Sequence, residues 1–220
     1  VLQDLLKNIV KPLGPTLKRI PERSRDVAIL HSFASSMFAG RGSYGWGGWI
    51  MDLHLALQWG GLDPRVLYEE EILRDHLKGV KVLVMPHCDV LPESVYKAVC
   101  DFQRKGGILI ADEFHVPGLL PDIRIDSVAR VSEDAAGSKE RLQKLGKEIR
   151  SKLGEYYTEH AASDNPDMVT HTRTFKNADY LFVINDKRVY GDYFGPWKLT
   201  QEQGRSEEHT SELQSLAYLV

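Results

Sequence analysis

Short apolar runs alternate with amphipathic segments between Asp26 and about Ile125. The runs DVAIL, RVLYE, VKVLVMP and ILIADE predict four strands, at 26–30, 65–69, 80–86 and 108–113. Apolar residues recur at helical spacing in 49–59 and 92–105, and each of these segments ends at a pair of glycines. Strands that are apolar throughout and alternate with helices are typical of a parallel sheet covered on both faces. We therefore predict a doubly wound α/β domain.

The segments on either side of this core have different patterns. Residues 138–157 predict another helix, with Leu142, Leu145, Ile149, Leu153 and Tyr156 on one stripe, so the α/β domain is expected to span 26–162. Residues 163–204 are expected to begin an antiparallel β domain, because 169–174 and 180–185 are β-branched or aromatic and flank the turn-like stretch FKNAD. The proline-rich residues 1–25 predict a linker with one short helix at most.

The C-terminal stretch from Arg205 to Ser215 has no apolar face. It matches, residue for residue, the translation of a common DNA-sequencing adapter, so we exclude 205–220 from reasoning about the fold. Because the chain also begins at Val1, we expect it to be a piece of a longer protein. The 1–25 segment would then join the domain to a missing upstream domain.

Composition and charge exclude several classes of function. The net charge is −3, and the tail carries one basic and three acidic side chains, so the rest of the chain has a net charge of −1. A nearly neutral chain gives no electrostatic reason to expect nucleic-acid or membrane partners. No apolar run approaches the roughly 20 residues of a membrane span. The two cysteines, Cys88 and Cys100, do not make a disulfide framework.

The stretch Gly40–Gly45 matches the glycine pattern of dinucleotide-binding loops. Glu69 follows at the end of the next predicted strand, where an acid could hold a ribose. The glycines of that motif must form a tight turn directly after the strand, whereas nine residues separate Leu30 from Gly40. A glycine-rich loop at the rim of the sheet is therefore favoured, and a nucleotide-binding module stays as an alternative. We expect no cofactor.

Cys88 is a candidate nucleophile, since it follows the third predicted strand at the edge where doubly wound sheets hold their sites. His87 and Asp89 adjoin it in sequence. Neighbouring residues rarely form a triad, because the base must approach the nucleophile in space. A small buried residue in the turn is the favoured interpretation, and a cysteine hydrolase is the alternative.

Asp112, Glu113 and His115 follow the fourth predicted strand. Such acids could bind a metal or a sugar hydroxyl, or they could accept hydrogen bonds from loop N–H groups, which we favour. Adjacent residues of a strand point to opposite faces, so Asp112 and Glu113 are a poor pair for glycoside hydrolysis, which needs facing carboxyl groups. No His or Cys spacing typical of a metal site occurs, and we expect no metal.

The stretch from Val80 to Glu113, with its helix start LPES and the strand GGILIADE, resembles the class I glutamine-amidotransferase-like domain found inside glycosidases. The type that it resembles is the middle, or trimerisation, domain of microbial beta-galactosidases. The resemblance covers about Asp26 to Ile125 and implies a flavodoxin-like sheet. It rests on the pattern of strands and helices more than on an invariant motif.

The sequence departs from this family at the position of the catalytic nucleophile. The amidotransferases carry a nucleophilic cysteine between glycines after the strand that follows the Gly-Gly pair. Here that position reads Asp112-Glu113-Phe114, and Cys88 lies one strand too early. The resemblance thus implies a non-catalytic domain without glutaminase chemistry. It would support homo-oligomerisation of a multidomain glycoside hydrolase whose catalytic barrel, absent here, binds the carbohydrate.

Overall fold

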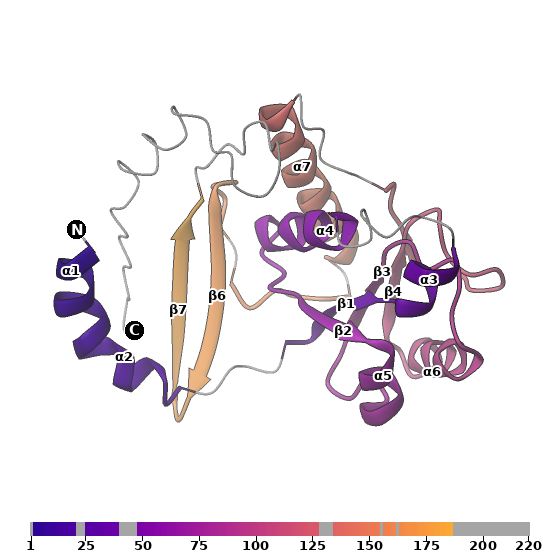
Figure 1. Cartoon of the computed structure of the whole chain (residues 1–220), viewed down its shortest axis with the longest axis horizontal. Helices are drawn as coiled ribbons and strands as arrows, with labels where there is room; N and C mark the ends of the chain where they lie inside the picture. Colours follow the sequence, from indigo (N-terminus) through magenta and orange to yellow (C-terminus); the bar gives the residue numbers. More distant parts are fainter. Residues whose placement is uncertain are drawn as a thin grey trace.

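The computed structural model describes residues 2–20, 25–39, 48–127, 134–154, 156–161 and 163–186. In this part of the chain, a parallel sheet of five strands lies between helices, and a separate antiparallel sheet has two strands (Figure 1). The predicted fold class is therefore confirmed. The glycine loop 40–45 and the adapter-like tail 205–220 lie outside the described residues.

The strands of the parallel sheet follow the order β2-β1-β3-β4-β5, with every neighbouring pair parallel. They are β1 (Val27–His31), β2 (Arg65–Tyr68), β3 (Val82–Met85), β4 (Ile108–Ala111) and β5 (Ile123–Arg124). The first four were predicted, each with boundaries within two residues of those observed. The fifth was missed, because two residues paired only with β4 are too short to give a periodic signal.

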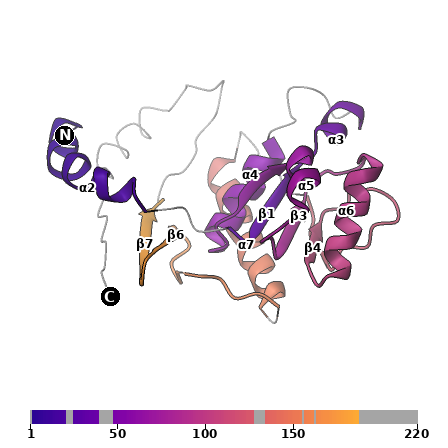
Figure 2. The ribbon, with the colours of Figure 1, turned by 90° about the horizontal axis from the view of Figure 1, so that it is seen from below.

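Helices cover both faces of this sheet (Figure 2). The helices on the faces are α4 (Gly48–Trp59), α5 (Glu69–Asp75), α6 (Glu93–Arg104) and α7 (Ala135–Leu153), whereas α3 (Phe33–Phe38) follows β1 at the carboxyl edge (Figure 1). Alternate strand residues point to opposite faces. Accordingly, Val27 and Ile29 pack with α4 and α7, whereas Ala28 and Leu30 pack with α5 and α6. The residues that β1 contributes to both cores are apolar, as the strand pattern indicated.

The helices α4 and α7 approach closely at two glycines. A Cβ atom on Gly146 would lie 2.0 Å from the carbonyl oxygen of Ala56, and one on Gly60 would lie 2.7 Å from that of Gly146. One predicted member of the α7 stripe is wrong: Tyr156 is 71% exposed and Tyr157 is buried. The helix ends at Leu153, so helical spacing no longer decides which tyrosine faces the core.

The N-terminal residues are more helical than predicted. α1 (Leu2–Leu5), the π-helical turn η1 (Leu6–Val10) and α2 (Lys11–Leu17) follow one another without a break. Pro12 and Pro15 both lie within this continuous helical run, Pro12 directly after the π-helical turn. None of the described helices is long and apolar enough to cross a membrane.

The predicted hairpin is confirmed. β6 (Met168–Phe175) and β7 (Ala178–Asn185) pair antiparallel and are joined by the two residues Lys176 and Asn177. The hairpin is attached to the α/β domain by polar contacts, since Nδ1 of His171 lies 2.7 Å from Oδ2 of Asp63. Beside this contact, the hydroxyl of buried Tyr157 donates a hydrogen bond of 2.7 Å to Asp26.

Candidate functional site at the carboxyl edge of the sheet

The carboxyl ends of β1 and β3 lie next to each other at the point where the chain changes direction across the sheet. The connection from β1 leads outward to β2, and the chain then crosses back to β3. Open α/β sheets bind ligands at such a switch point. Ser32, His87 and Cys88 follow these two strands, and Asp112 follows the adjacent β4.

Asp112 and His87 form a close pair across the ends of β3 and β4. Oδ2 of Asp112 lies 2.7 Å from Nδ1 of His87 and also accepts the His87 backbone N–H at 2.9 Å. Oδ1 accepts the backbone N–H of Phe114 at 3.0 Å. Asp112 is only 2% exposed, so both of its oxygens are used inside the protein. The carboxylate thereby fixes two turns, as the structural interpretation of the sequence predicted.

The His87 ring is enclosed by aromatic side chains. It stacks on Trp49 with ring centroids 4.6 Å apart and planes 6° apart, and it packs at an angle on Phe114. The backbone of His87 has a φ of 50°, in the left-handed region that non-glycine residues seldom adopt. The hydrogen bonds to Asp112 and the stacking hold this conformation. The sequence showed no signal for the Trp49 contact, which joins residues far apart in the chain.

Cys88 points into the core below this edge. Its side chain is fully buried, and Sγ lies 3.4 Å from the carbonyl oxygen of Pro86. Burial raises the pKa of the Cys88 thiol well above its ordinary value, and the carboxylates of Asp112 and Glu69 raise it further. A raised pKa lowers the thiolate fraction at neutral pH, which is the reverse of what a nucleophilic cysteine needs.

A second polar cluster joins the ends of β1 and β2. The Ser32 hydroxyl donates to Oε1 of buried Glu69 at 2.6 Å, and the Ala34 N–H donates to the same oxygen at 3.3 Å. Ser35 donates to the carbonyl of Val90 at 2.6 Å. Glu69, suggested above as a ribose ligand, thus caps the turn into α3. The sequence around Ser32 gave no sign of this partner, which lies 37 residues away.

Glu113 lies apart from Asp112. It is exposed, and its carboxylate accepts the Ser127 N–H at 2.9 Å and the Ser127 hydroxyl at 2.5 Å. Burial by itself would raise the pKa of Glu113, but the hydrogen bonds from Ser127 outweigh it, and the pKa is lowered. His115 lies in a bridge with Cys88, and its Nδ1 is 2.7 Å from the carbonyl oxygen of Asp112. The two carboxylates therefore do not face one another.

One cavity at this edge is small. A cavity between Trp49, His87, Asp112 and Leu145 has a volume of about 10 Å³. That is about the volume that one water molecule needs and far below a ligand-sized cavity. The structure thus brings together the candidates His87, Cys88 and Asp112, but each is engaged in internal contacts. In this arrangement the His87 and Asp112 side chains hold the turns after β3 and β4.

Several solved structures share the fold. The beta-galactosidase from Bacillus circulans sp. alkalophilus has a TM-score of 0.57 and 15% identity, over 80% of this chain and 37% of that chain. The beta-galactosidase from Rahnella sp. R3 has a TM-score of 0.55 and 13% identity, over 82% of this chain and 38% of that chain. The alpha-L-fucosidase isoenzyme 2 from Paenibacillus thiaminolyticus has a TM-score of 0.54 and 14% identity, over 85% of this chain and 41% of that chain.

Each of these matches covers only part of the solved enzyme. The chain spans 37%, 38% and 41% of their lengths. At these identities the comparison shows a common fold. No protein-family model matches the sequence, and no curated protein matches it.

Proposed function

We propose that this chain is a non-catalytic supporting domain of a multidomain glycoside hydrolase, with carbohydrate hydrolysed by a barrel outside the chain. The observation that carries the proposal is the environment of Asp112. It occupies the turn after β4, where the amidotransferase-like relatives would hold their nucleophilic cysteine, and it accepts three hydrogen bonds from that turn and its neighbour. Because its carboxylate oxygens are used in these hydrogen bonds, Asp112 is suited to holding the two turns in place.

The comparisons support the glycosidase context. Two structural neighbours are named as beta-galactosidases and another as an alpha-L-fucosidase, so the fold recurs within enzymes named for different glycosides. A domain that is common to enzymes of different specificity is suited to a supporting role. The sheet order also agrees with the flavodoxin-like arrangement that the resemblance implies.

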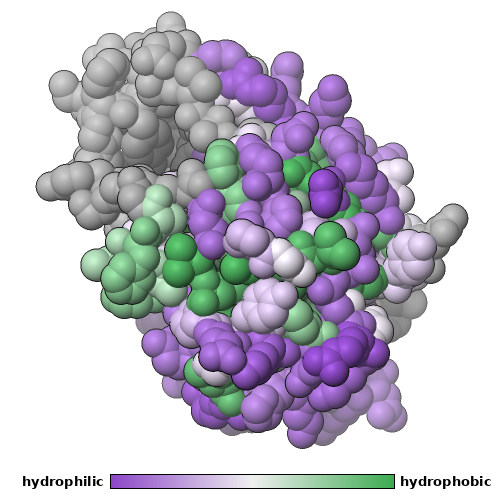
Figure 3. Space-filling view, turned by 90° about the vertical axis from the view of Figure 1, so that its right-hand side faces the viewer, coloured by the Kyte–Doolittle hydropathy of each residue, from purple (hydrophilic) through white to green (hydrophobic). Residues whose placement is uncertain are grey.

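The surface of α3 supports a role in assembly. Phe33, Met37 and Phe38 are 54%, 60% and 76% exposed. Exposed apolar side chains that gather on one element are typical of association sites. Figure 3 shows the side of the molecule on which α3 and α6 lie, where hydrophobic residues are set among mostly hydrophilic ones. We propose that α3 contacts another copy of the parent protein.

The catalytic part of the proposal is tested by assaying the purified chain on nitrophenyl galactosides, nitrophenyl fucosides and glutamine. We expect no turnover of any substrate. Turnover that disappears in Cys88→Ala would contradict the proposal and favour a cysteine hydrolase. Turnover that survives in Cys88→Ala but is lost in Asp112→Asn would place a reaction at the carboxyl edge.

The assembly part is tested by sedimentation velocity over a range of concentrations. We expect self-association that Phe38→Ser weakens. Leu120→Ser is the matched control, because Leu120 is similarly exposed, at 74%, but lies on the loop before β5. A monomer at all concentrations, or equal weakening by both variants, would count against α3 as the contact.

A further inference from the structure

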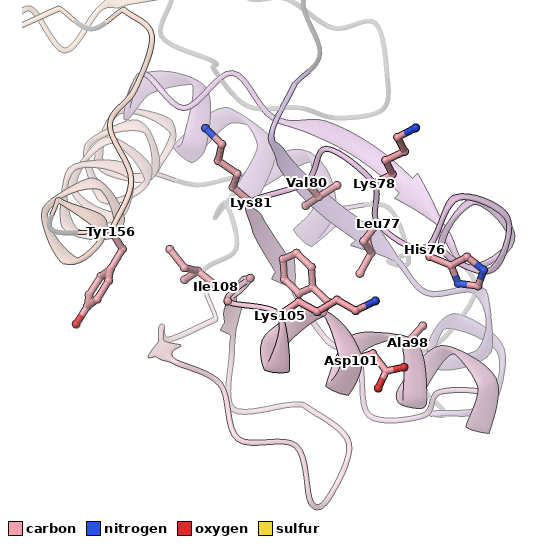
Figure 4. Close-up of a pocket in the computed structure, with 13 residues that line it drawn as sticks. His76, Leu77, Lys78, Val80, Lys81, Ala98, Asp101, Lys105, Ile108 and Tyr156 are labelled. Atoms are coloured by element: carbon pink, nitrogen blue, oxygen red, sulfur yellow. The ribbon is translucent and has the colours of Figure 1, made fainter.

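A hollow lies at the amino edge of the parallel sheet, at the end of the strands opposite the candidate site. It is bounded by the turn before β3, the C-terminal end of α6, the first residue of β4 and Tyr156 (Figure 4). Its volume is about 430 Å³, which lies within the range of small-ligand pockets.

The floor of the hollow is apolar. Leu77, Val80 and Phe102 are buried beneath it, and Ile108 is partly buried beside them. Tyr156, which is 71% exposed, stands at one side. A ligand seated here would cover hydrocarbon and aromatic carbon, and this apolar contact would contribute to its affinity.

The rim of the hollow is cationic. It carries Lys78, Lys81 and Lys105 with His76, whereas Asp101 is its one acidic side chain. Asp101 is already paired with Arg104, and Lys81 lies 3.2 Å from Asp26. Lys78 and Lys105 have no side-chain partner among the described residues. The rim therefore has cationic groups in excess over the acids that could neutralise them.

The lysines can reach a ligand in the hollow. In Figure 4 the Lys105 side chain lies across the floor between Leu77 and Asp101, whereas those of Lys78 and Lys81 start at the upper rim and point away from the floor. A lysine ammonium is carried on a flexible four-carbon stem with rotatable donors. Lys105 already lies beside the floor, and a change of side-chain rotamer would turn Lys78 toward an anion without movement of the backbone (Figure 4).

Two glycines keep the hollow open on the α6 side. Gly106 has a φ of 89°, and a Cβ atom placed on it would meet nothing within 4 Å. A Cβ atom on Gly107 would come within 2.3 Å of the Phe102 ring, so a side chain there would displace the floor. The missing side chains leave the apolar floor accessible beside the Lys105 ammonium.

We propose that this hollow binds a small organic anion, in which an apolar or aromatic body carries a carboxylate, phosphate or sulfate group. The floor would take the apolar body, and the lysines would take the anionic group as point charges, which need no fixed bidentate geometry. The site is separate from the carboxyl edge and does not depend on the proposed function.

The experiment is a titration of the full chain with 2-naphthalenesulfonate, followed by amide chemical shifts. We expect shifts at 76–81 and 101–108, and binding weakened about tenfold in the double variant Lys78→Gln, Lys105→Gln. The matched control is Lys97→Gln, Lys147→Gln, which removes the same charge from exposed positions on α6 and α7. Sulfate and the uncharged 2-naphthylmethanol should each bind about tenfold more weakly or not at all.

Three results would overturn the proposal. Shifts confined to the carboxyl edge or to α3 would place the probe elsewhere. Equal affinity of the two double variants would mean that general charge is responsible. Equal binding of 2-naphthylmethanol would leave an apolar hollow in which the lysines have no role. Urea unfolding of each variant verifies that a loss of binding is not a loss of fold.

Discussion

At the carboxyl edge of the sheet, the buried Asp112 uses both carboxylate oxygens to hold His87 and Phe114, whereas at the amino edge Lys78 and Lys105 are exposed beside an open hollow. The first edge is the usual ligand side of a doubly wound sheet, yet its polar groups are consumed by the fold. The second edge is ordinarily only structural, yet it has space and unpaired charge. The location of a binding site thus depends on which polar groups remain available after folding.

The amino edge also contains a cluster that resembles the carboxyl edge. Asp26 is buried and receives hydrogen bonds from Tyr157 and an ion pair from Lys81. Burial by itself would raise the pKa of Asp26, but the hydrogen bonds from Tyr157 and Lys81 outweigh it and the pKa is lowered. Charge that supports the fold and charge that is free for a ligand therefore lie side by side at this edge. The predictions below separate the two.

The largest effect is expected from Asp112→Ala. It leaves the backbone N–H groups of His87 and Phe114 and the His87 ring without their acceptor, and we expect a loss of about 3 kcal/mol of unfolding free energy. Urea unfolding measures it. The neighbouring Glu113→Ala is the control, with an expected loss below about 1 kcal/mol because Glu113 is exposed. Equal losses would contradict the account of the carboxyl edge.

The two cysteines should differ strongly in reactivity. Cys88 is fully buried with a raised thiol pKa, whereas Cys100 is partly exposed. We expect Cys88 to react with iodoacetamide about a hundredfold more slowly than Cys100 at pH 8, since only thiolate reacts and opening of the core is rare. Mass spectrometry of the labelled peptides measures both rates. Fast labelling of Cys88 with a midpoint below the free-thiol value of about 8.5 would restore it as a nucleophile.

Removal of one hydroxyl tests the supporting cluster at the amino edge. Tyr157→Phe deletes the hydrogen bond to Asp26, and we expect a loss of about 1 to 2 kcal/mol at pH 7. Because the pKa of Asp26 is lowered, its stabilising effect is present above the unfolded pKa of about 3.9 and is lost as the pH falls through the folded value.

The difference between wild type and Tyr157→Phe should therefore shrink below about pH 4. Tyr156→Phe is the matched control, since the adjacent tyrosine is 71% exposed and should change stability by less than about 0.5 kcal/mol. A difference that stays constant down to about pH 2 would show that the hydrogen bond does not depend on the Asp26 charge.

The smallest effect on stability is expected at the rim of the hollow. Lys78→Gln with Lys105→Gln should change the unfolding free energy by less than about 0.5 kcal/mol, because neither ammonium has a partner among the described residues. Urea unfolding at low and high salt measures it. A loss above about 1 kcal/mol would show that these lysines support the fold, and the contrast between free and committed charge would fail.

The sequence was sufficient to predict the sheet and most of its helices. Buried strands such as Val82–Met85 are apolar at every position, and α6 has Val95, Val99 and Phe102 on one face, so local pattern determines both. The hydrophobic pattern did not predict the two-residue strand Ile123–Arg124. It also assigned the wrong tyrosine to the core after the end of α7, where Tyr157 is buried and Tyr156 is exposed. It also underestimated the helical N-terminal segment, because its prolines were taken as breaks.

The candidate site was predictable only in part. His87, Cys88 and Asp112 could be named because they follow strands, but their roles depend on contacts between distant elements. The stacking of Trp49 on His87 and the bond from Ser32 to Glu69 join separate loops, and no local spacing encodes them. The amino-edge hollow is formed by three separate stretches of chain, so its lysines gave no signal as a group.

The central proposal is that this domain supports a glycoside hydrolase whose catalytic barrel lies outside the chain. The most direct measurement is a long sequencing read of the parent gene on both sides of this sequence. The account predicts an upstream (β/α)₈ pattern with carboxylates at the ends of two strands, to which the catalytic question would then move. A start codon directly before Val1 and a stop codon in place of the adapter-like tail would contradict it.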